Sequence, residues 1–279
     1  MMRAAGLLFG VGTHLLFAVT VWQLVWFLAG FSNSRSGDSD WHALAVDAGL
    51  ALQFAISHSA LLHPTVRGWL GRWIAAPFYG LFYCVATCLS LLWLFSCWQA
   101  SPSVVWAFQG STALVIQIGF ACCWIGLLHS LSLTGLGWQT GLTPWWAWVR
   151  GLPAPRREFR PRSSYLLLRH PVYLSFLGLI WLTPEVTIDR AALIALWTVY
   201  IFIGSWLKDR RLEYYLGKTY REYESRVAGY PFIPLGPLAR IPIADPAQEP
   251  ENSPVTLSFR QPEPSTPHPS RENGIRRAA

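Results

Sequence analysis

The sequence predicts an all-α integral membrane protein, a polytopic helical bundle of about five to six membrane segments with a C-terminal helical hairpin and a cytoplasmic amphipathic helix. Of its 279 residues, 52% are hydrophobic and only 13% are charged, whereas about 25% of residues are charged in ordinary soluble domains. Several segments before residue 210 exceed the ~18 consecutive apolar residues that mark a transmembrane helix. These observations exclude a soluble fold.

Four membrane spans precede the hairpin. They are expected at residues 4–31, 43–62, 74–98 and 114–133. The first is longer than the apolar core of a signal peptide and lacks a small-residue cleavage site, so we expect it to remain as a span. Asp47, Gln53 and His58 in the second span are expected to face the bundle interior, because polar side chains are costly in lipid.

The segment from Tyr165 to Tyr223 predicts a helical hairpin that enters the membrane and returns. It begins with YLLLRHPVYLSF, turns at residues 183–185 and returns through residues 191–207. The entering arm, residues 172–183, is roughly 18 Å long as a helix, which is short for a hydrocarbon core of about 30 Å. From residue 205 the return helix is expected to leave the membrane and continue as an amphipathic helix. One face of that helix would carry Asp209, Leu212, Leu216, Tyr220 and Tyr223.

Basic residues predict the orientation of the chain. The net charge is +7, and arginines are concentrated in the connection at residues 134–164, with more basic residues after the last apolar run. Since basic loops remain in the cytoplasm beside anionic lipid, we expect the N-terminus and both feet of the hairpin to be cytoplasmic. No basic module interleaved with aromatic residues is present, so the expected partners are membrane lipids and not nucleic acid.

Polar residues predict a site where the two feet of the hairpin meet. Pro171 favours the first position of a helix, so His170 is the expected cap residue. Free backbone N–H groups, the Arg169 guanidinium and an imidazole together make a receptor for a carboxylate or phosphate. Asp209 on the opposite foot, beside Arg210, suits an amine or ribose hydroxyls. The feet thus resemble a receptor for a zwitterion, although anchors that snorkel to lipid headgroups explain the same residues equally well.

Other signals indicate no further site. The five cysteines lie within or at the end of apolar helices, where buried free thiols are usual. Cys84 and Cys88 share a helix face, but no second pair of ligands accompanies them, so no metal site is predicted. The glycines of residues 135–141 follow no strand, which excludes a dinucleotide-binding loop.

The motifs of the hairpin resemble a known family. RHPVYLSF, the apolar hairpin, its acidic exit and the following Leu, Gly and Tyr positions of residues 212–223 are similar to the C-terminal signature of the isoprenylcysteine carboxyl methyltransferase superfamily. Within it, the chain resembles the methanethiol S-methyltransferase branch. The matching residues are Phe54, Ala55, His58 and Ser59 in the second span, Trp181, Thr183, Pro184 and Thr187 at the hairpin turn, and Thr198, Tyr200, Ile201 and Gly204 in the return helix.

The resemblance implies an integral-membrane enzyme that binds S-adenosylmethionine between the cytoplasmic feet of the hairpin. The implied cofactor-binding residues are Arg169, His170 and Tyr173, which would hold the methionine carboxylate and adjacent atoms, and Asp209, Arg210 and Tyr220, which would line the amino or ribose side. The implied acceptor is a small or lipophilic thiol. Its most specific form is methanethiol, which would become dimethyl sulfide.

The implied reaction needs few catalytic groups. Methyl transfer from a sulfonium to a thiolate removes two opposite charges, so an apolar site that aligns the reactants favours it. The thiol must first lose its proton, and His58, His129 or His170 can assist. We take His58 and His129 as the candidate catalytic residues. A packing hydrogen bond inside the bundle is the slightly favoured alternative for His58, although ionisable residues inside a membrane are functional candidates by default.

The chain departs from the family pattern at two places. Lys208 and Asp209 stand where the family has paired glutamates, and residues 129–135 read HSLSLTG where the branch shows Asp-His-x-Glu-Leu-Phe-Gly. The acceptor side of the site is therefore expected to differ. The alternative functions are an isoprenylcysteine-type or other lipophilic-acceptor methyltransferase, a reductase that uses a nicotinamide cofactor, and a non-enzymatic membrane accessory protein of the denitrification type. The short chain and few spans argue against the reductase.

Three regions follow from these expectations. Residues 1–164 form the transmembrane bundle with a cytoplasmic Arg- and Trp-rich loop, whose tryptophans suit the headgroup zone. Residues 165–237 form the hairpin and the cofactor-binding C-terminal region. Residues 238–279 are rich in Pro, Ser and charge and are expected to be a disordered tail.

Overall fold

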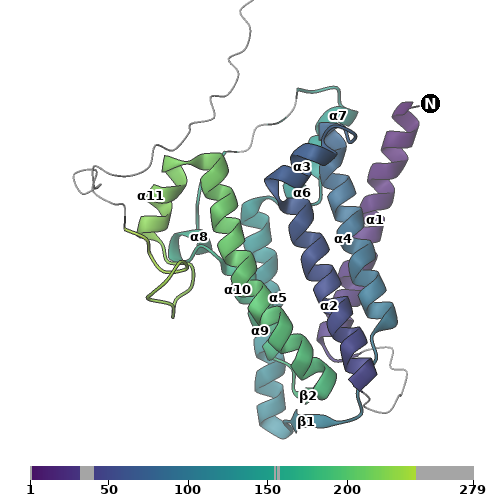
Figure 1. Ribbon diagram of the computed structural model, residues 1–279, viewed down its shortest axis with the longest axis vertical. Coiled ribbons are helices and arrows are strands. Elements are labelled where there is room, and N and C mark those ends of the chain that lie inside the picture. Colours follow the sequence, from purple (N-terminus) through teal and green to yellow (C-terminus); the bar gives the residue numbers. More distant parts are fainter. Residues whose placement is uncertain (1, 32–40, 154, 156–157, 243–279) are drawn as a thin grey trace, which may run out of the picture. The chain divides into compact units, whose positions relative to one another are not determined.

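Long apolar helices dominate the structure. The computed structural model describes residues 2–31, 41–153, 155 and 158–242. Among these residues, five helices are long and apolar enough to cross a membrane. They are α1 (Met2–Leu28), α2 (Trp41–Leu62), α4 (Ala76–Cys97), α5 (Gly110–Thr134) and α10 (Ile188–Leu216) (Figure 1). A shorter apolar helix, α9 (Pro171–Trp181), packs against α5 and α10. The predicted class, a polytopic helical membrane protein, is confirmed.

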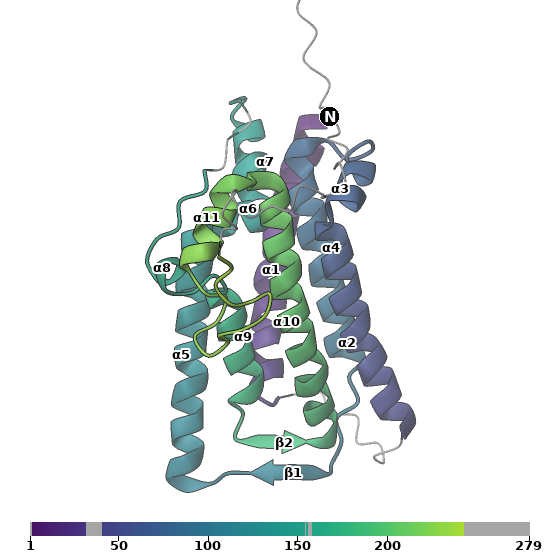
Figure 2. The ribbon, with the colours of Figure 1, turned by 60° about the vertical axis from the view of Figure 1, so that its left-hand side comes forward.

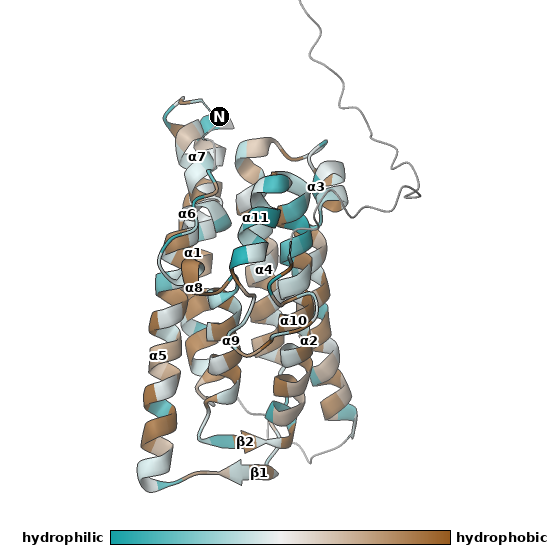
Figure 3. Cartoon of the chain, turned by 90° about the vertical axis from the view of Figure 1, so that its left-hand side faces the viewer, coloured by the Kyte–Doolittle hydropathy of each residue, from teal (hydrophilic) through white to brown (hydrophobic). Residues whose placement is uncertain are grey.

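The helices bury one side in a shared apolar core and expose apolar side chains on the other. Leu81, Leu94 and Leu179 are fully buried in the core. Leu8 is 74% exposed on α1 and Val115 is 67% exposed on α5, and extended apolar surface of this kind suits lipid. Figure 3 shows hydrophobic residues along the bundle and hydrophilic residues on α11 (Lys218–Arg226) and the adjoining end of α10.

The four predicted spans correspond to α1, α2, α4 and α5, with ends shifted by a few residues. α4 begins with Pro77 in its first turn, where a proline is favoured. α5 ends at Gly135, whose φ of +79° is a conformation that glycine adopts most readily. Much of the predicted polar loop between the first two spans, residues 32–40, lies outside the described residues.

Two predicted connections contain short helices. The segment after α2 forms α3 (Pro64–Leu70), and the ring of His63 accepts a hydrogen bond from the Thr65 amide at 3.3 Å. The connection at residues 134–164 contains α6 (Leu136–Gln139), α7 (Leu142–Val149) and the start of α8 (Ser164–Leu167). Among its tryptophans, Trp145 is buried and donates to the Gly6 carbonyl at 2.9 Å.

The hairpin tip includes a short strand. β2 (Glu185–Thr187) pairs antiparallel with β1 (Val104–Ala107), with Val104 opposite Thr187 and Trp106 opposite Val186. The predicted turn at residues 183–185 therefore overlaps β2. Figure 2 shows the two strands at the end of the bundle opposite to α11. Their pairing attaches the loop between α4 and α5 to the tip of the hairpin.

The predicted amphipathic helix is divided in two. A continuous helix was expected from residue 205 to Tyr223, but α10 ends at Leu216 and α11 begins at Lys218. Gly217 lies between them with a φ of +52°, where a side chain would be strained. The chain consequently turns at Gly217, and α11 folds back beside the end of α10 (Figure 1).

Buried carboxylates fasten the loop before β1 at the strand end of the bundle. Asp189 accepts hydrogen bonds from the Trp98 indole at 2.8 Å and from the Ser101 amide at 3.0 Å. Asp47 accepts one from the Gln99 amide at 2.9 Å. Asp47 is 1% exposed, which confirms its predicted interior position.

We expect Asp189→Ala to lower the stability of the fold. Two buried N–H groups would lose their acceptor, at a cost on the order of 2–4 kcal/mol. Thermal unfolding in detergent micelles measures the change. Glu185→Ala, at an exposed position of β2, is the matched control and should alter stability by less than about 0.5 kcal/mol. Equal effects of the two substitutions would contradict the fastening role of Asp189.

Candidate functional site

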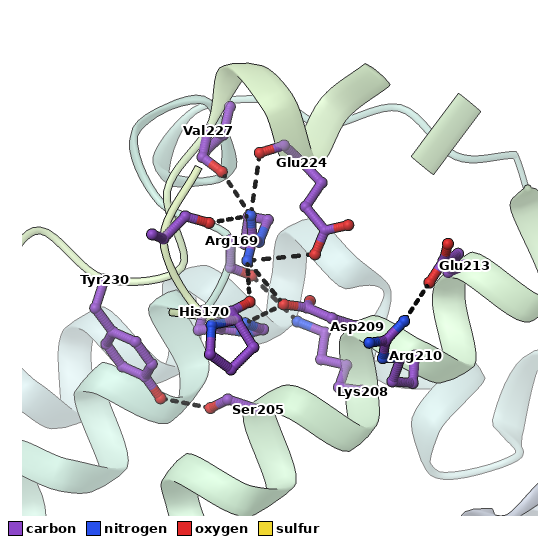
Figure 4. Close-up of polar contacts among 12 residues, drawn as sticks. Arg169, His170, Ser205, Lys208, Asp209, Arg210, Glu213, Glu224, Val227 and Tyr230 are labelled. Carbon is purple, nitrogen blue, oxygen red and sulfur yellow. Dashed lines mark hydrogen bonds and ion pairs between the residues drawn. The ribbon is translucent and has the colours of Figure 1, made fainter. Parts of the chain in front are cut away.

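Four side chains from distant positions in the sequence meet at the feet of the hairpin. Arg169 and His170 precede α9, Asp209 lies near the end of α10, and Tyr220 lies on α11. All four are buried, and His170 is completely enclosed. The convergence of the two feet that the sequence predicted is therefore present (Figure 4).

Asp209 is the centre of this cluster. Its Oδ2 atom accepts hydrogen bonds from Arg169 Nη2 and His170 Nε2, both at 3.0 Å. Its Oδ1 atom accepts one from the Tyr220 hydroxyl. Burial and the neighbouring carboxylate raise the pKa of Tyr220, so this hydroxyl keeps its proton and remains a donor. The carboxylate was expected to face a ligand, but in this structure three protein donors occupy it.

The guanidinium of Arg169 holds the segment that follows α11. Its Nη1 atom donates to the carbonyls of Glu224, Val227 and Ala239 at 3.0–3.1 Å. Its Nη2 atom also approaches the Pro237 carbonyl at 3.4 Å and a carboxylate oxygen of Glu224 at 3.4 Å. The terminal nitrogens of this arginine were expected to receive an anion, and here backbone carbonyls and carboxylates occupy them.

Buried residues continue past the predicted domain boundary at residue 238. Leu238 and Ala239, which were assigned to the tail, are buried. The Leu238 carbonyl accepts a hydrogen bond from the Gly229 amide at 2.8 Å. We call residues 227–241 the strap, because Arg169 binds it against the feet of the hairpin. The rest of the predicted tail, from residue 243, lies outside the described residues.

His170 presents one ring nitrogen that the protein does not use. It is the N-cap residue of α9 with Pro171 first in the helix, as predicted. Because Nε2 donates to the Asp209 carboxylate, the neutral ring keeps a lone pair on Nδ1. His170 Nδ1 and Arg169 Nε are both buried without a hydrogen-bond partner. Two consecutive residues therefore each have one unused polar atom, an acceptor on His170 and a donor on Arg169.

Tyr173 connects this cluster to the return helix. Its hydroxyl donates to the Gly204 carbonyl at 3.2 Å, and its ring packs edge-on against His170 with 5.6 Å between ring centroids. Arg210, by contrast, is exposed and pairs with Glu213 at 3.2 Å. The structure thus brings five of the six predicted cofactor-binding residues together and leaves Arg210 outside the cluster.

The two candidate catalytic histidines have different surroundings. His58 on α2 lies inside the bundle, 2.9 Å from the Tyr83 hydroxyl on α4. The next residue, Ser59, donates to the Tyr200 hydroxyl on α10 at 3.3 Å. His129 on α5 is exposed and contacts Ser163 at 3.1 Å. Only His58 belongs to an interior polar cluster.

Sequence reasoning missed two charged residues near these clusters. Arg211 is half-buried and lies within electrostatic range of His58, Tyr83 and Tyr200, yet the described part of the chain gives it no ion-pair or hydrogen-bond partner. Glu224 is buried beside Arg169, and burial raises the pKa of its carboxyl group. Helical spacing carried the signal for both, since Arg211 is three turns after Tyr200 and Glu224 one turn after Tyr220.

The fold and the cluster together define a class, a polytopic helical membrane protein with a buried ionic network at the feet of a helical hairpin. In the described part of the chain, no three His, Cys, Asp or Glu side chains are placed to hold a metal ion.

Comparison with known proteins gives the family. The chain is 32% identical over 239 residues to a methanethiol S-methyltransferase of Pseudomonas sp. (strain GM41(2012)), covering 81% of this chain and 89% of that protein. It is 28% identical over 228 residues to methanethiol S-methyltransferase 1 of Bradyrhizobium diazoefficiens, covering 79% and 80%. It is also 28% identical over 188 residues to Nurim of Sus scrofa, covering 64% of this chain and 71% of that protein. No family model and no solved structure matches it significantly. The chain belongs to the isoprenylcysteine carboxyl methyltransferase-like family, which confirms the predicted resemblance.

We expect Arg169→Lys to destabilise the protein and release the strap. A lysine keeps the charge but has no planar fork with which to reach four carbonyls and two carboxylates, so the loss should be on the order of 3 kcal/mol. Limited proteolysis in detergent measures cleavage within residues 227–241, and thermal unfolding measures stability. Arg221→Lys, at an exposed position of α11, is the control. Unchanged cleavage in Arg169→Lys would contradict the assignment.

We expect His170 to make stability depend on acid pH. Burial, reinforced by Lys208 and Arg169, lowers the pKa of His170 from 6.5 to about 4, although Asp209 opposes this shift. The unfolded chain therefore binds a proton that the folded protein does not, so stability falls as the pH falls from about 6.5 to about 4. At 1.36 kcal/mol per pKa unit, the loss is on the order of 3 kcal/mol.

His170→Gln tests this expectation, because an amide N–H replaces Nε2–H and does not titrate. Thermal unfolding of both proteins at about pH 7 and about pH 4.5 should show a smaller loss of stability in the variant. An equal loss in both proteins would assign the acid sensitivity to other groups.

Proposed function

We propose that this protein is an S-adenosylmethionine-dependent membrane methyltransferase whose acceptor is a small or lipophilic thiol, most specifically methanethiol. Family membership supports a membrane methyltransferase, and two of its relatives are named for methanethiol S-methylation. The single observation that carries the proposal is the Asp209 network, which joins the feet of the hairpin around unused polar atoms of Arg169 and His170.

The unused atoms fit the polar end of the proposed cofactor. Arg169 Nε can donate to a carboxylate, and the lone pair on His170 Nδ1 can accept from an amine or hydroxyl. We assign to these two residues and Tyr173 the contact with the methionine part. Asp209 and Tyr220 then act as positioning residues, because their own polar atoms are already occupied. Exposed Arg210 is left for a peripheral contact.

The proposed orientation puts the feet of the hairpin in the cytoplasm, where the cofactor is made. The basic residues of the 134–164 connection and of α10 and α11 support it through the preference of basic loops for the cytoplasmic side. The paired strands at the other end of the bundle would then face the opposite side of the membrane.

The interior cluster around His58 is the proposed acceptor side. When bound, S-adenosylmethionine supplies a methyl group on a positively charged sulfur. We propose that His58 takes the proton from the acceptor thiol, with the Tyr83 hydroxyl fixing the imidazole. Arg211, within electrostatic range of both residues, would stabilise the resulting thiolate. The proposal assigns proton transfer to His58 and not to the exposed His129.

Purified protein in detergent, given labelled S-adenosylmethionine and methanethiol, should release volatile labelled dimethyl sulfide. His58→Gln should lower kcat by about 10²- to 10⁴-fold, the usual contribution of a general base. His14→Gln is the matched control, since His14 also lies in a span but contacts the Gly10 carbonyl of its own helix at 2.7 Å.

Two results would overturn parts of the proposal. Unchanged turnover in His58→Gln, with a large loss in His129→Gln, would move the catalytic role to α5. Absence of both product and cofactor binding in the native protein would refute the methyltransferase proposal and favour the non-enzymatic accessory role.

A further inference from the structure

The ammonium group of Lys208 lies over two tyrosine rings at the feet of the hairpin. Its Nζ atom is 5.5 Å from the ring centroid of Tyr165 on α8 and 5.6 Å from that of Tyr173 on α9. The same atom donates a hydrogen bond to the Arg169 carbonyl at 3.2 Å. Two aromatic faces and a carbonyl oxygen form a site that attracts a cation. We call these three groups the cation cage.

The cage adjoins the unused polar atoms of the network. Tyr173 packs edge-on against His170, and the charge of Lys208 acts on that ring. The carbonyl of Arg169 belongs to the cage. The Nε atom of the same residue, which has no hydrogen-bond partner, lies with His170 Nδ1 in the proposed site for the methionine part. A ligand with a carboxylate, an amine and a third, positively charged group could therefore use both places at once.

Lys208 can leave the cage without disturbing the network. It is half-buried, and a lysine stem is long and flexible enough to carry its ammonium to the surface. The Asp209 carboxylate next to it is engaged by Arg169, His170 and Tyr220. Withdrawal of the lysine leaves these hydrogen bonds intact.

We propose that the cation cage takes the sulfonium of the methyl donor, and that Lys208 occupies the cage until the donor binds. This inference rests on the proposed function, because S-adenosylmethionine is the ligand that would bring a sulfonium to this place. Lys208 then competes with the charged donor more strongly than with the neutral product, S-adenosylhomocysteine. The cage favours donor over product, and the lysine reduces that preference.

The test compares the affinities of the native protein and its variants for S-adenosylmethionine and S-adenosylhomocysteine, measured by calorimetry in detergent without acceptor. Tyr165→Leu removes one aromatic face and should lower the donor-to-product affinity ratio about tenfold. Lys208→Met removes the competing ammonium and should raise the ratio by a similar factor.

Matched variants separate the cage from general effects. Tyr165→Phe keeps the aromatic face and should preserve the native ratio, and it remains informative if Tyr165→Leu does not fold. Lys218→Met removes one exposed positive charge of α11 and should leave the ratio unchanged. The Tyr165 carbonyl, which accepts from the Tyr223 hydroxyl at 2.6 Å, is retained in every variant.

The outcomes distinguish this inference from the proposed function. If the native protein binds neither ligand, the proposed function and the cation-cage proposal are both refuted. If it binds both, and Tyr165→Leu and Lys208→Met each change the two affinities by the same factor, the proposed function stands and the cation cage is refuted.

Discussion

The buried ion pair between Arg169 and Asp209 is the constraint on which the structure at the feet of the hairpin depends. A charge removed from water costs several kcal/mol unless its partners are well placed. Arg169 obtains them from α10, α11 and the strap, and their carbonyls and carboxylates come from positions as distant as Ala239. The hairpin, the turn at Gly217 and the strap must therefore all be in place before this arginine is satisfied. Satisfying a single guanidinium thus links the formation of three chain segments.

The same pair determines what the neighbouring histidine can do. Asp209 takes the Nε2–H of His170 and thereby leaves the Nδ1 lone pair free. Burial lowers the pKa of His170, and protonation of Nδ1 would also place a further cation beside Lys208 and Arg169. The ring is held as a neutral acceptor with a fixed orientation. This is the state that a receptor for an amine or hydroxyl requires.

Much of this architecture is predictable from the sequence, and the failures have physical reasons. Long apolar runs identify the spans because lipid admits few alternatives. The meeting of Arg169 and Asp209 follows from a hairpin whose two feet return to one side. The break at Gly217 does not follow from periodicity, because the 3- and 4-residue spacing continues through it. The β1 and β2 pairing joins segments about 80 residues apart, and neither short strand has a strong local pattern. The hydrogen bonds from the Arg169 guanidinium to backbone carbonyls could not be predicted either, because every residue has a carbonyl and the sequence does not show which ones will lie nearby.

Positive charge at the feet of the hairpin would act in opposite ways on the two proposed substrates, the methyl donor and the thiol acceptor. Lys208 and Arg211 stand one helical turn apart on α10, on the same side as Tyr200 and Gly204. The chain has a cation at residue 208, where the resemblance stated from the sequence implied a glutamate. In the proposed reaction, these two cations would oppose the binding of a positively charged donor but would stabilise an anionic acceptor, and the thiolate is the harder of the two species to obtain near neutral pH. The proposed cation cage would compensate on the donor side through aromatic faces, whose attraction for a sulfonium requires no buried carboxylate. In this arrangement Asp209 need not contact the sulfonium, and its carboxylate can remain hydrogen-bonded to Arg169 and His170.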